Sequence, residues 1–421
     1  MKKSLLAVAA LGAFASAAQA QSSVTVYGIM DVGYVGANSR QAYGTAPAAG
    51  NLAAGVVKST SAGIASGAES TSRFGLKGSE DLGGGLSAFF TIEQKIDPDQ
   101  AGTALSSSTG DRQTFVGLKK NGLGDFALGT QYTIVHQAVA VTDAGQQNNI
   151  VGNLIYTGAT GAATISKLAG SSATLATAQN ASGMVAGTSY TIRQSNALTL
   201  NTDTFGGFKG HLMLTQNNLN QTQNTTAGTA SDGGNTNSSG WGIGADYTWN
   251  KLFLTANYQA FTARNTSSVT TTNNMVLFGT LQGNTTGTNV NDNQQYYAAT
   301  YDFGILKAYA QYVSRSSTQN NNSAVYQKYN AEQIGVRSFV TPVVEVFASG
   351  GYGNFTNAGV SNPKANLAAY QLGSNYWLSK RTNLYAIYGQ TSTSNVASTA
   401  APTVFSSFNQ NNYAVGVRHT F

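Results

Sequence analysis

The chain has 421 residues and a formal net charge of +6, but charged residues make up only 10%, against about 25% in soluble domains. It has no cysteine, which excludes a disulfide framework and a thiolate metal site, and no Lys/Arg run indicates a nucleic-acid surface. Glycine (48) and tyrosine (21) are frequent and proline (5) is rare, which disfavours an ordinary soluble domain.

The first twenty residues predict a cleaved signal peptide. Met1-Lys2-Lys3 is a positive start, 4–17 is apolar, and Ala18-Gln19-Ala20 is a small-x-small cleavage site. We therefore expect a signal peptide over 1–20 and one domain over 21–421. No later segment approaches the roughly 20 apolar residues of a membrane helix. Because backbone groups in lipid must pair internally, an exported chain of this composition fits a closed β-barrel.

The main hydrophobic period is two, as in the run from Leu86 to Ile96 and in the run from Trp241 to Trp249. Several aromatic residues lie near segment ends, where interfacial girdles belong, among them Tyr247, Trp249 and Trp377. The alternation predicts sixteen strands. They are expected at 24–36, 70–80, 86–97, 111–120, 125–130, 188–202, 208–216, 240–249, 252–263, 294–303, 305–315, 331–340, 343–353, 366–378, 383–392 and 411–421. The start of the strand at 188–202 could lie several residues later.

The connections alternate between short turns, such as Asn250-Lys251, and long segments rich in Asn, Ser, Thr, Gly and Ala. The long ones are expected at 37–69, 98–110, 131–187, 217–239, 264–293, 316–329, 354–365 and 393–409. Short periplasmic turns and longer outer loops are typical of outer-membrane barrels. A barrel of sixteen strands is large enough to enclose an aqueous channel.

The C-terminal residues alternate from Tyr413 to the last residue, Phe421, and end on this aromatic side chain. An unpaired apolar edge strand would aggregate. We therefore expect this strand to pair with 24–36 and close the barrel, with Phe421 as the closure and assembly signal.

Four sequence pieces resemble the general porins of Gram-negative bacteria, most closely the trimeric porins of beta-proteobacteria. They are Ser23–Gly33, Ser72–Gly83, Arg112–Lys119 with Gly122-Leu123-Gly124, and the Phe421 end. The resemblance implies a homotrimer of sixteen-stranded antiparallel barrels in the outer membrane. The expected partners are outer-membrane lipid, lipopolysaccharide and the barrel-assembly machinery.

The resemblance also implies that the third long loop, about Tyr132 to Gly187, folds inward and narrows the pore. It assigns lumen positions to Arg73, Arg112 and Arg193. Strict alternation would point Arg112 outward, so its inward placement depends on the resemblance or on a bulge.

The inward loop contains few acidic residues, since Asp143 is the single acid between Gln131 and Ile192. Arginine or lysine rings favour anions in pores. We therefore hypothesise an anion-favouring constriction at Arg73, Arg112 and Arg193; alternatively, these arginines brace the wall. Asp143 either faces the arginines or caps a turn within the loop.

Alternation places further charges on the lumen side, where neighbouring opposite charges would cancel. The basic residues are Arg73, Lys77, Lys95, Lys307, Arg315, Arg337 and Arg418, with Lys77 assigned to the constriction. The acidic ones are Asp31, Glu93, Asp97, Asp246, Asp302 and Glu345.

The sequence favours a passive pore for small hydrophilic solutes and ions. A solute-specific channel for organic anions or sugars is the alternative on the same barrel, and a secreted adhesin or surface enzyme is the third hypothesis. His136, His211 and His419 lie on separate segments and predict no catalytic constellation. We expect no cofactor, metal or nucleic acid.

Overall fold

The structure is a computed structural model that describes residues 23–43, 56–99, 111–156, 189–220, 235–265, 290–319, 326–358, 365–394 and 405–421. The predicted signal peptide lies outside these residues. Among the described residues, no helix is long and apolar enough to cross a membrane.

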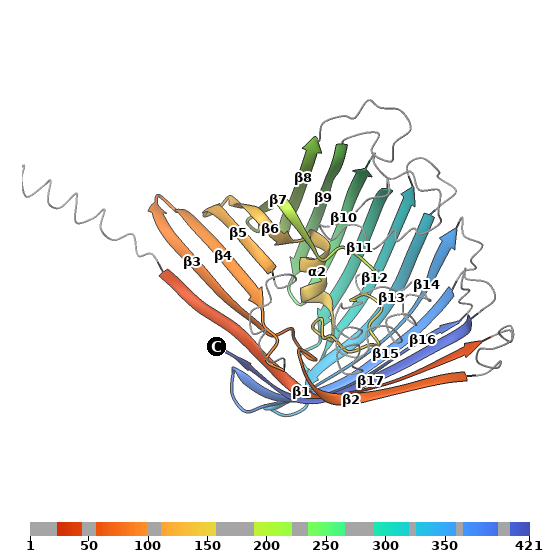
Figure 1. Cartoon of the computed structure of the whole chain (residues 1–421). Helices are drawn as coiled ribbons and strands as arrows, with labels where there is room; N and C mark the ends of the chain where they lie inside the picture. Colours follow the sequence, from red (N-terminus) through yellow and green to blue (C-terminus); the bar gives the residue numbers. More distant parts are fainter. Residues whose placement is uncertain are drawn as a thin grey trace, which may run out of the picture.

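The described residues form antiparallel strands and one helix, α2 (Figure 1). The elements are β1 (Ser23–Tyr43), β2 (Val56–Ser66), β3 (Arg73–Gly83), β4 (Leu86–Lys95), β5 (Asp111–Lys120), β6 (Gly124–Tyr132), α2 (Ile134–Thr142), β7 (Arg193–Thr202), β8 (Phe208–Asn220), β9 (Asn235–Trp249), β10 (Leu252–Asn265), β11 (Val290–Asp302), β12 (Lys307–Gln319), β13 (Tyr326–Phe339), β14 (Val344–Ala358), β15 (Ala365–Trp377), β16 (Thr382–Ser394) and β17 (Phe405–Thr420).

Each strand from β3 onward pairs with the next, and β17 pairs with β1, so the sheet closes on itself. Residues 32–42 of β1 pair with β2 and residues 23–29 pair with β3. β2 and β3 are therefore two halves of one strand position, interrupted at Gly67–Ser72. The barrel has sixteen positions, as predicted.

The predicted closure is also confirmed. Gly33 lies opposite Gly416, and Gly28 and Phe421 exchange both of their backbone hydrogen bonds at 3.2 Å. Closure through the last strand leaves no unpaired apolar edge at the C-terminus.

Strand lengths differ from the prediction at the end of the barrel with the long connections. The loop expected over 37–69 is wrong, because β1 runs to Tyr43 and β2 covers Val56–Ser66. β13, β14 and β17 extend in the same way by several residues. These extensions are rich in Asn, Gln, Ser and Thr, with only scattered apolar residues such as Phe355, so the period-two pattern is weak there. Pairing with neighbouring strands forms them instead. The strand expected from 188 begins at Arg193.

The outer face is apolar and carries two aromatic belts. Near the long connections, tyrosines pair across strands, with Tyr370 and Tyr388 6.0 Å apart and Tyr34 and Tyr413 6.5 Å apart between ring centroids. At the opposite end Trp249 and Phe303 are exposed. Trp377, expected in a girdle, instead donates from its indole nitrogen to the buried Glu345 on the inner face. Such belts mark the two membrane interfaces.

Helix α2 lies within the barrel (Figure 1), directly after β6. Thr133 caps its N-terminus by accepting from the His136 backbone nitrogen. Val135 and Val139 are fully buried and belong to one apolar cluster with Tyr296 of β11. Burial of this apolar helix face against inward side chains of the wall holds the chain inside the barrel.

Candidate pore constriction

The segment that follows α2 is bound to the inner wall through polar contacts at several strands. Arg337 of β13 donates to the Ala144 carbonyl at 2.6 Å, and Gln371 of β15 donates to the Ile150 carbonyl at 2.6 Å. The Asn149 side chain donates to the Gly67 carbonyl at 2.7 Å. The described part of the predicted inward loop therefore crosses the barrel interior, while 157–188 lies outside the described residues.

A glycine on the wall makes room for this segment. An ideal Cβ on Gly389 of β16 would lie 1.7 Å from the Val151 carbonyl oxygen, so no larger residue fits there. The close approach also brings the Gly152 nitrogen within 3.0 Å of the Thr391 hydroxyl.

Asp143 is satisfied by its own segment. Its carboxylate accepts from the Gln147 nitrogen at 2.7 Å and from the Asn153 side chain at 3.0 Å. Burial raises the pKa of this carboxyl, which lies outside the strands. The sequence left two alternatives for Asp143, a position facing the arginines or a cap on a turn within the loop. The contacts are those of a turn cap.

The three arginines assigned by resemblance gather on the wall formed by β3, β5 and β7. Glu93 of β4 is the acid among them: it forms an ion pair with Arg112, and a terminal guanidinium nitrogen of Arg73 lies 4.0 Å from it. One carboxylate thus faces several guanidinium groups, and the excess charge is positive.

A bulge places Arg112 on the inner face. Glu93 pairs with Gln113 while Gln94 pairs with Asp111, so Arg112 has no partner on β4. An extra residue of this kind locally changes the direction of a strand's side chains. Strict alternation therefore fails at Arg112.

Arg193 lies beside a second irregularity. Gly129 pairs with Ala197 but Gln131 pairs with Gln194, which leaves an extra residue on β7, where Asn196 has a φ of 52°. Arg193 itself pairs with Tyr132.

Tyr132 lies between two of the arginines. The Arg112 and Arg193 guanidinium carbons are 6.0 and 5.8 Å from its ring centroid, and Arg112 also donates to its hydroxyl. The tyrosine is therefore a neutral contact for both cations.

Arg73 is positioned by the break between β2 and β3. It donates to the Thr71 carbonyl at 2.9 Å and to the Ser70 hydroxyl at 3.0 Å. The break is fixed by the buried Asp31, whose carboxylate accepts from the backbone nitrogens of Glu69 and Ser70. Asp31 thus positions Arg73 without touching it.

His136 of α2 is near the arginine cluster. Burial, and then the charges of Arg193, Arg112 and Arg73, hold the pKa of its imidazole well below its usual range. The residue is therefore neutral at pH 7 and adds no charge to the site.

Most other predicted lumen charges form pairs. Arg315 contacts the buried Asp292 at 2.5 Å, and Arg337 contacts Glu345 at 2.6 Å. Further pairs are Arg418 with Glu69, Lys95 with Asp97, and His211 with Asp246. Asp302 accepts from the Gly304 nitrogen in a turn.

Two lysines interact with rings instead of acids. Lys77 lies 5.3 Å from the Tyr27 centroid and Lys307 lies 5.2 Å from that of Tyr309. Lys77 lies on β3, as Arg73 does, but its ammonium group contacts the ring of Tyr27 and not the residues around Glu93.

Sequence reasoning missed two acids of these pairs, Glu69 and Asp292, because both fell in expected loops. Asp292 lies two residues before Gln294 and four before Tyr296, all buried on one face. Extending the alternation of that strand upstream would have found it.

His136, His211 and His419 lie on different elements, as predicted. Within the described ranges, no group of three His, Asp or Glu side chains could hold a metal ion.

A closed barrel with apolar outer belts, a charged inner wall and a chain segment across its interior defines an outer-membrane pore protein. The chain belongs to the Gram-negative porin family, whose sequence profile matches residues 7–396.

Among curated relatives, an outer-membrane porin protein of Bordetella pertussis is 37% identical over 134 residues, covering 32% of this chain and 34% of the relative. Outer membrane porin protein 32 of Delftia acidovorans is 38% identical over 143 residues, covering 34% and 35%. The aligned part thus spans about a third of these relatives' length.

Among solved structures, an anion-selective porin from Comamonas acidovorans superimposes with a TM-score of 0.62 at 21% identity, covering 95% of this chain and 100% of that one. OmpT of Vibrio cholerae, titled a trimer form, has a TM-score of 0.55 at 13% identity, covering 95% and 99%. At these sequence identities, the similarities show a shared fold and nothing further.

Proposed function

We propose that the protein forms a water-filled pore for passive diffusion of small hydrophilic solutes and ions across the outer membrane, with a preference for anions. The observation that carries the proposal is the cluster of Arg73, Arg112 and Arg193 near Glu93, the one acid that forms ion pairs with these arginines among the described residues. Fixed positive charge at a narrow point lowers the energy of an anion relative to a cation. Lys77, on the same strand as Arg73, would extend this field along the wall.

The paired charges elsewhere on the wall support locating selectivity at the cluster. Arg315, Arg337 and Arg418 each have an acidic partner, so their fields largely cancel. The Comamonas acidovorans protein is named an anion-selective porin. At 21% identity, however, the similarity supports a shared fold and not a shared ion preference. The arginine geometry is therefore the basis of the proposed sign.

Assembly is proposed to follow other porins: a homotrimer inserted by the barrel-assembly machinery, with Phe421 as its signal, in contact with lipid and lipopolysaccharide. Residues 1–20 are proposed to be removed on export. N-terminal sequencing of the mature protein should then begin at Gln21, and an intact Met1 would contradict cleavage.

Planar-bilayer recordings across a potassium chloride gradient test the function. We expect open-channel conductance and a reversal potential of the sign produced by chloride permeation. Absence of conductance from correctly folded protein would overturn the pore, whereas a cation-selective sign would overturn the anion preference alone. Replacing Arg73, Arg112 and Arg193 together by Gln should move the reversal potential toward zero.

A further inference from the structure

Two phenylalanines of β4 and β5 form a ring pair on the lumen side of the wall. The rings of Phe89 and Phe115 meet edge to face, with 6.2 Å between their centroids. Val116, the neighbour of Phe115, is 58% exposed on the membrane face, so Phe115 points into the lumen. The interior of a barrel that holds water is mostly polar. Stability of the barrel alone therefore does not account for two apolar rings there.

The ring pair is accessible from the lumen. Phe89 and Phe115 are partly exposed, and Gly129 of β6, opposite Phe115, has no side chain to cover its ring. Other inward aromatic rings are covered: Tyr296, Tyr309 and Phe347 are each at most 8% exposed. A solute in the lumen can thus contact the rings of β4 and β5, but it cannot reach these three.

The arginine cluster lies just beyond the ring pair on the same strands. The Arg112 guanidinium binds Glu93, which is two residues along β4 from Thr91, the partner of Phe115. Two residues of strand correspond to about 7 Å at roughly 3.3 Å per residue. Lys77 of β3 pairs with the other side of Thr91, so it lies level with the ring of Phe115. Positive charge and aromatic surface are therefore separated by one short molecule.

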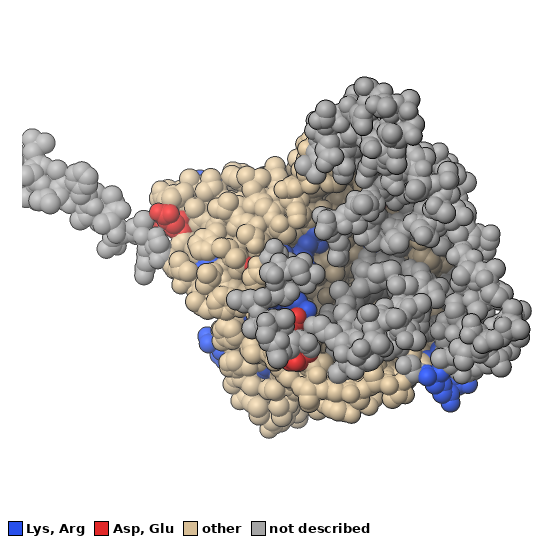
Figure 2. Space-filling model, viewed as in Figure 1, with Lys and Arg blue, Asp and Glu red and all other residues tan. Residues whose placement is uncertain are grey.

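The arginines present more surface to the lumen than their acid does. The side chains of Arg73 and Arg112 are 19% and 11% exposed, whereas that of Glu93 is 5% exposed. Both carboxylate oxygens of Glu93 already have donors, because Arg112 binds one and the Tyr27 hydroxyl donates to the other at 3.1 Å. Figure 2 shows Lys and Arg atoms near the centre of the view, beside β3 to β6. A solute that reaches this wall therefore meets positive charge.

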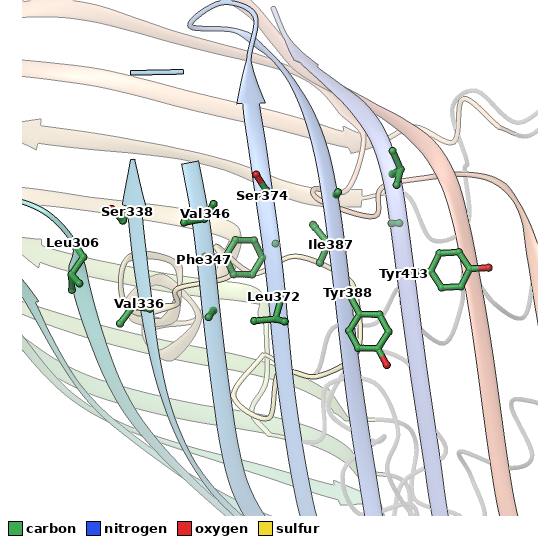
Figure 3. A pocket seen from close by; sticks show the side chains of 15 residues that line it. Leu306, Val336, Ser338, Val346, Phe347, Leu372, Ser374, Ile387, Tyr388 and Tyr413 are labelled. Atoms are coloured by element: carbon green, nitrogen blue, oxygen red, sulfur yellow. The ribbon is translucent and has the colours of Figure 1, made fainter. Parts of the chain in front are cut away.

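A larger apolar surface lies on the outside of the barrel. A groove of about 660 Å³ crosses β13 to β17 (Figure 3), and its Leu372 and Tyr413 are 52% and 37% exposed. This groove is part of the face that contacts the membrane, where an unpaired ion is strongly disfavoured. The ring pair, and not the groove, is the apolar surface that a charged solute in transit meets.

We propose that the lumen wall of β3 to β5 binds aromatic carboxylates during their passage. The carboxylate is held by Arg73 and Arg112, since a guanidinium offers paired donors to carboxylate oxygens. The aromatic ring packs against Phe115 and Phe89, where contact between rings adds to the burial of apolar area. This proposal rests on the proposed pore, and it narrows the anion preference to one class of organic anion.

Block of the chloride current through the full-length protein in planar bilayers tests the site. The probes are phenylacetate, cyclohexylacetate, which has the charge without the aromatic ring, and phenylacetamide, which has the ring without the charge. Phenylacetate should block saturably, and the concentration that halves the current should be about two- to twelvefold lower than for cyclohexylacetate. Phenylacetamide should block more weakly than either. Equal block by phenylacetate and cyclohexylacetate would overturn the ring contact, and equal block by phenylacetamide would overturn the carboxylate contact.

Two independent variants, Phe115→Leu and Phe89→Leu, test the position of the site. Each keeps an apolar side chain but removes the ring, so each should raise the half-blocking concentration of phenylacetate by about two- to twelvefold. The matched control is Phe253→Leu, on the lumen side of β10 and away from the arginines, which should be blocked like the wild type. Heat-dependent migration on gels shows that each variant is folded.

The outcomes separate this site from the pore itself. Wild-type block of both F115L and F89L would overturn the placement on β4 and β5. A channel that conducts chloride but is not blocked by phenylacetate overturns the site and leaves the proposed pore standing. Folded protein without conductance overturns the pore, and the site with it.

Discussion

Arg112 forms its ion pair with Glu93 because Arg112 is the extra residue of a bulge in β5. In a regular strand without the bulge, Arg112 would lie on the same face as Val116, which is exposed on the outer wall. One irregularity in strand pairing therefore determines whether a guanidinium lies in the membrane or in the lumen. The pair fixes Arg112 in place, whereas the contact of the Arg193 guanidinium among the described residues is the ring of Tyr132.

Arg193→Gln should reduce the anion preference with little effect on folding. No ion pair of Arg193 appears among the described contacts, so its removal leaves no buried carboxylate unpaired. We expect the reversal potential in a salt gradient to move toward zero. Lys380→Gln, in an exposed turn, is the control and should leave it unchanged. An unaltered reversal potential in R193Q would mean that this arginine braces the wall.

Glu93→Gln should shift selectivity the opposite way. It removes the carboxylate that faces Arg73 and Arg112 while keeping a side chain that can still accept a hydrogen bond. The ratio of anion to cation permeability should therefore rise. The measurement is the reversal potential of E93Q and R193Q in the same salt gradient, and shifts of equal sign would contradict the proposed cluster.

Asp292→Asn should destabilise the barrel strongly. Arg315 and Asp292 are 1% and 0% exposed, so the substitution removes the carboxylate from a buried ion pair. Breaking a buried pair in this way costs about 3–5 kcal/mol. The urea midpoint of unfolding in detergent should fall accordingly. The double variant D292N/R315M should recover part of the loss, and a single variant as stable as the wild type would show that the pair is not desolvated.

Gly389→Val should displace the segment that follows α2. Its Cβ would meet the Val151 carbonyl at 1.7 Å, and overpacking of this kind costs about 1–3 kcal/mol. We expect a changed single-channel conductance with more current noise. Gly350→Ala is the control, because the nearest atom to its ideal Cβ is 3.8 Å away. Wild-type currents in G389V would argue against docking of the segment at β16.

His136 predicts a pH dependence of stability. Its folded-state pKa is lowered, so the unfolded chain takes up a proton below the usual value of about 6.5 while the folded protein does not. The contribution of neutral His136 to the free energy of unfolding is thus fully present above that pH. It is lost as the pH falls, by up to about 1.4 kcal/mol per pH unit. The unfolding midpoint of His136→Gln should decline less steeply than that of the wild type from about pH 6.5 to 4.5. Parallel declines would contradict this.

The sequence by itself determined the barrel class, the strand order and the closure of β1 on β17. These follow from the period-two pattern and the turn positions, which are local properties of the chain. Most inward charges, such as Arg337 and Glu345, were also predictable, since alternation assigns a face wherever one side of a strand is apolar.

Only the tertiary structure decided where on the inner wall basic side chains outnumber acidic ones. Arg112 and Arg193 depend on bulges, and Arg73 depends on a strand break held by Asp31. Bulges and breaks are fixed by the pairing register of neighbouring strands, which local periodicity does not encode. The same holds for β2, whose polar residues form a strand because β1 offers it hydrogen bonds. The charge balance at the constriction is therefore a property of strand register, and not of the number of arginines.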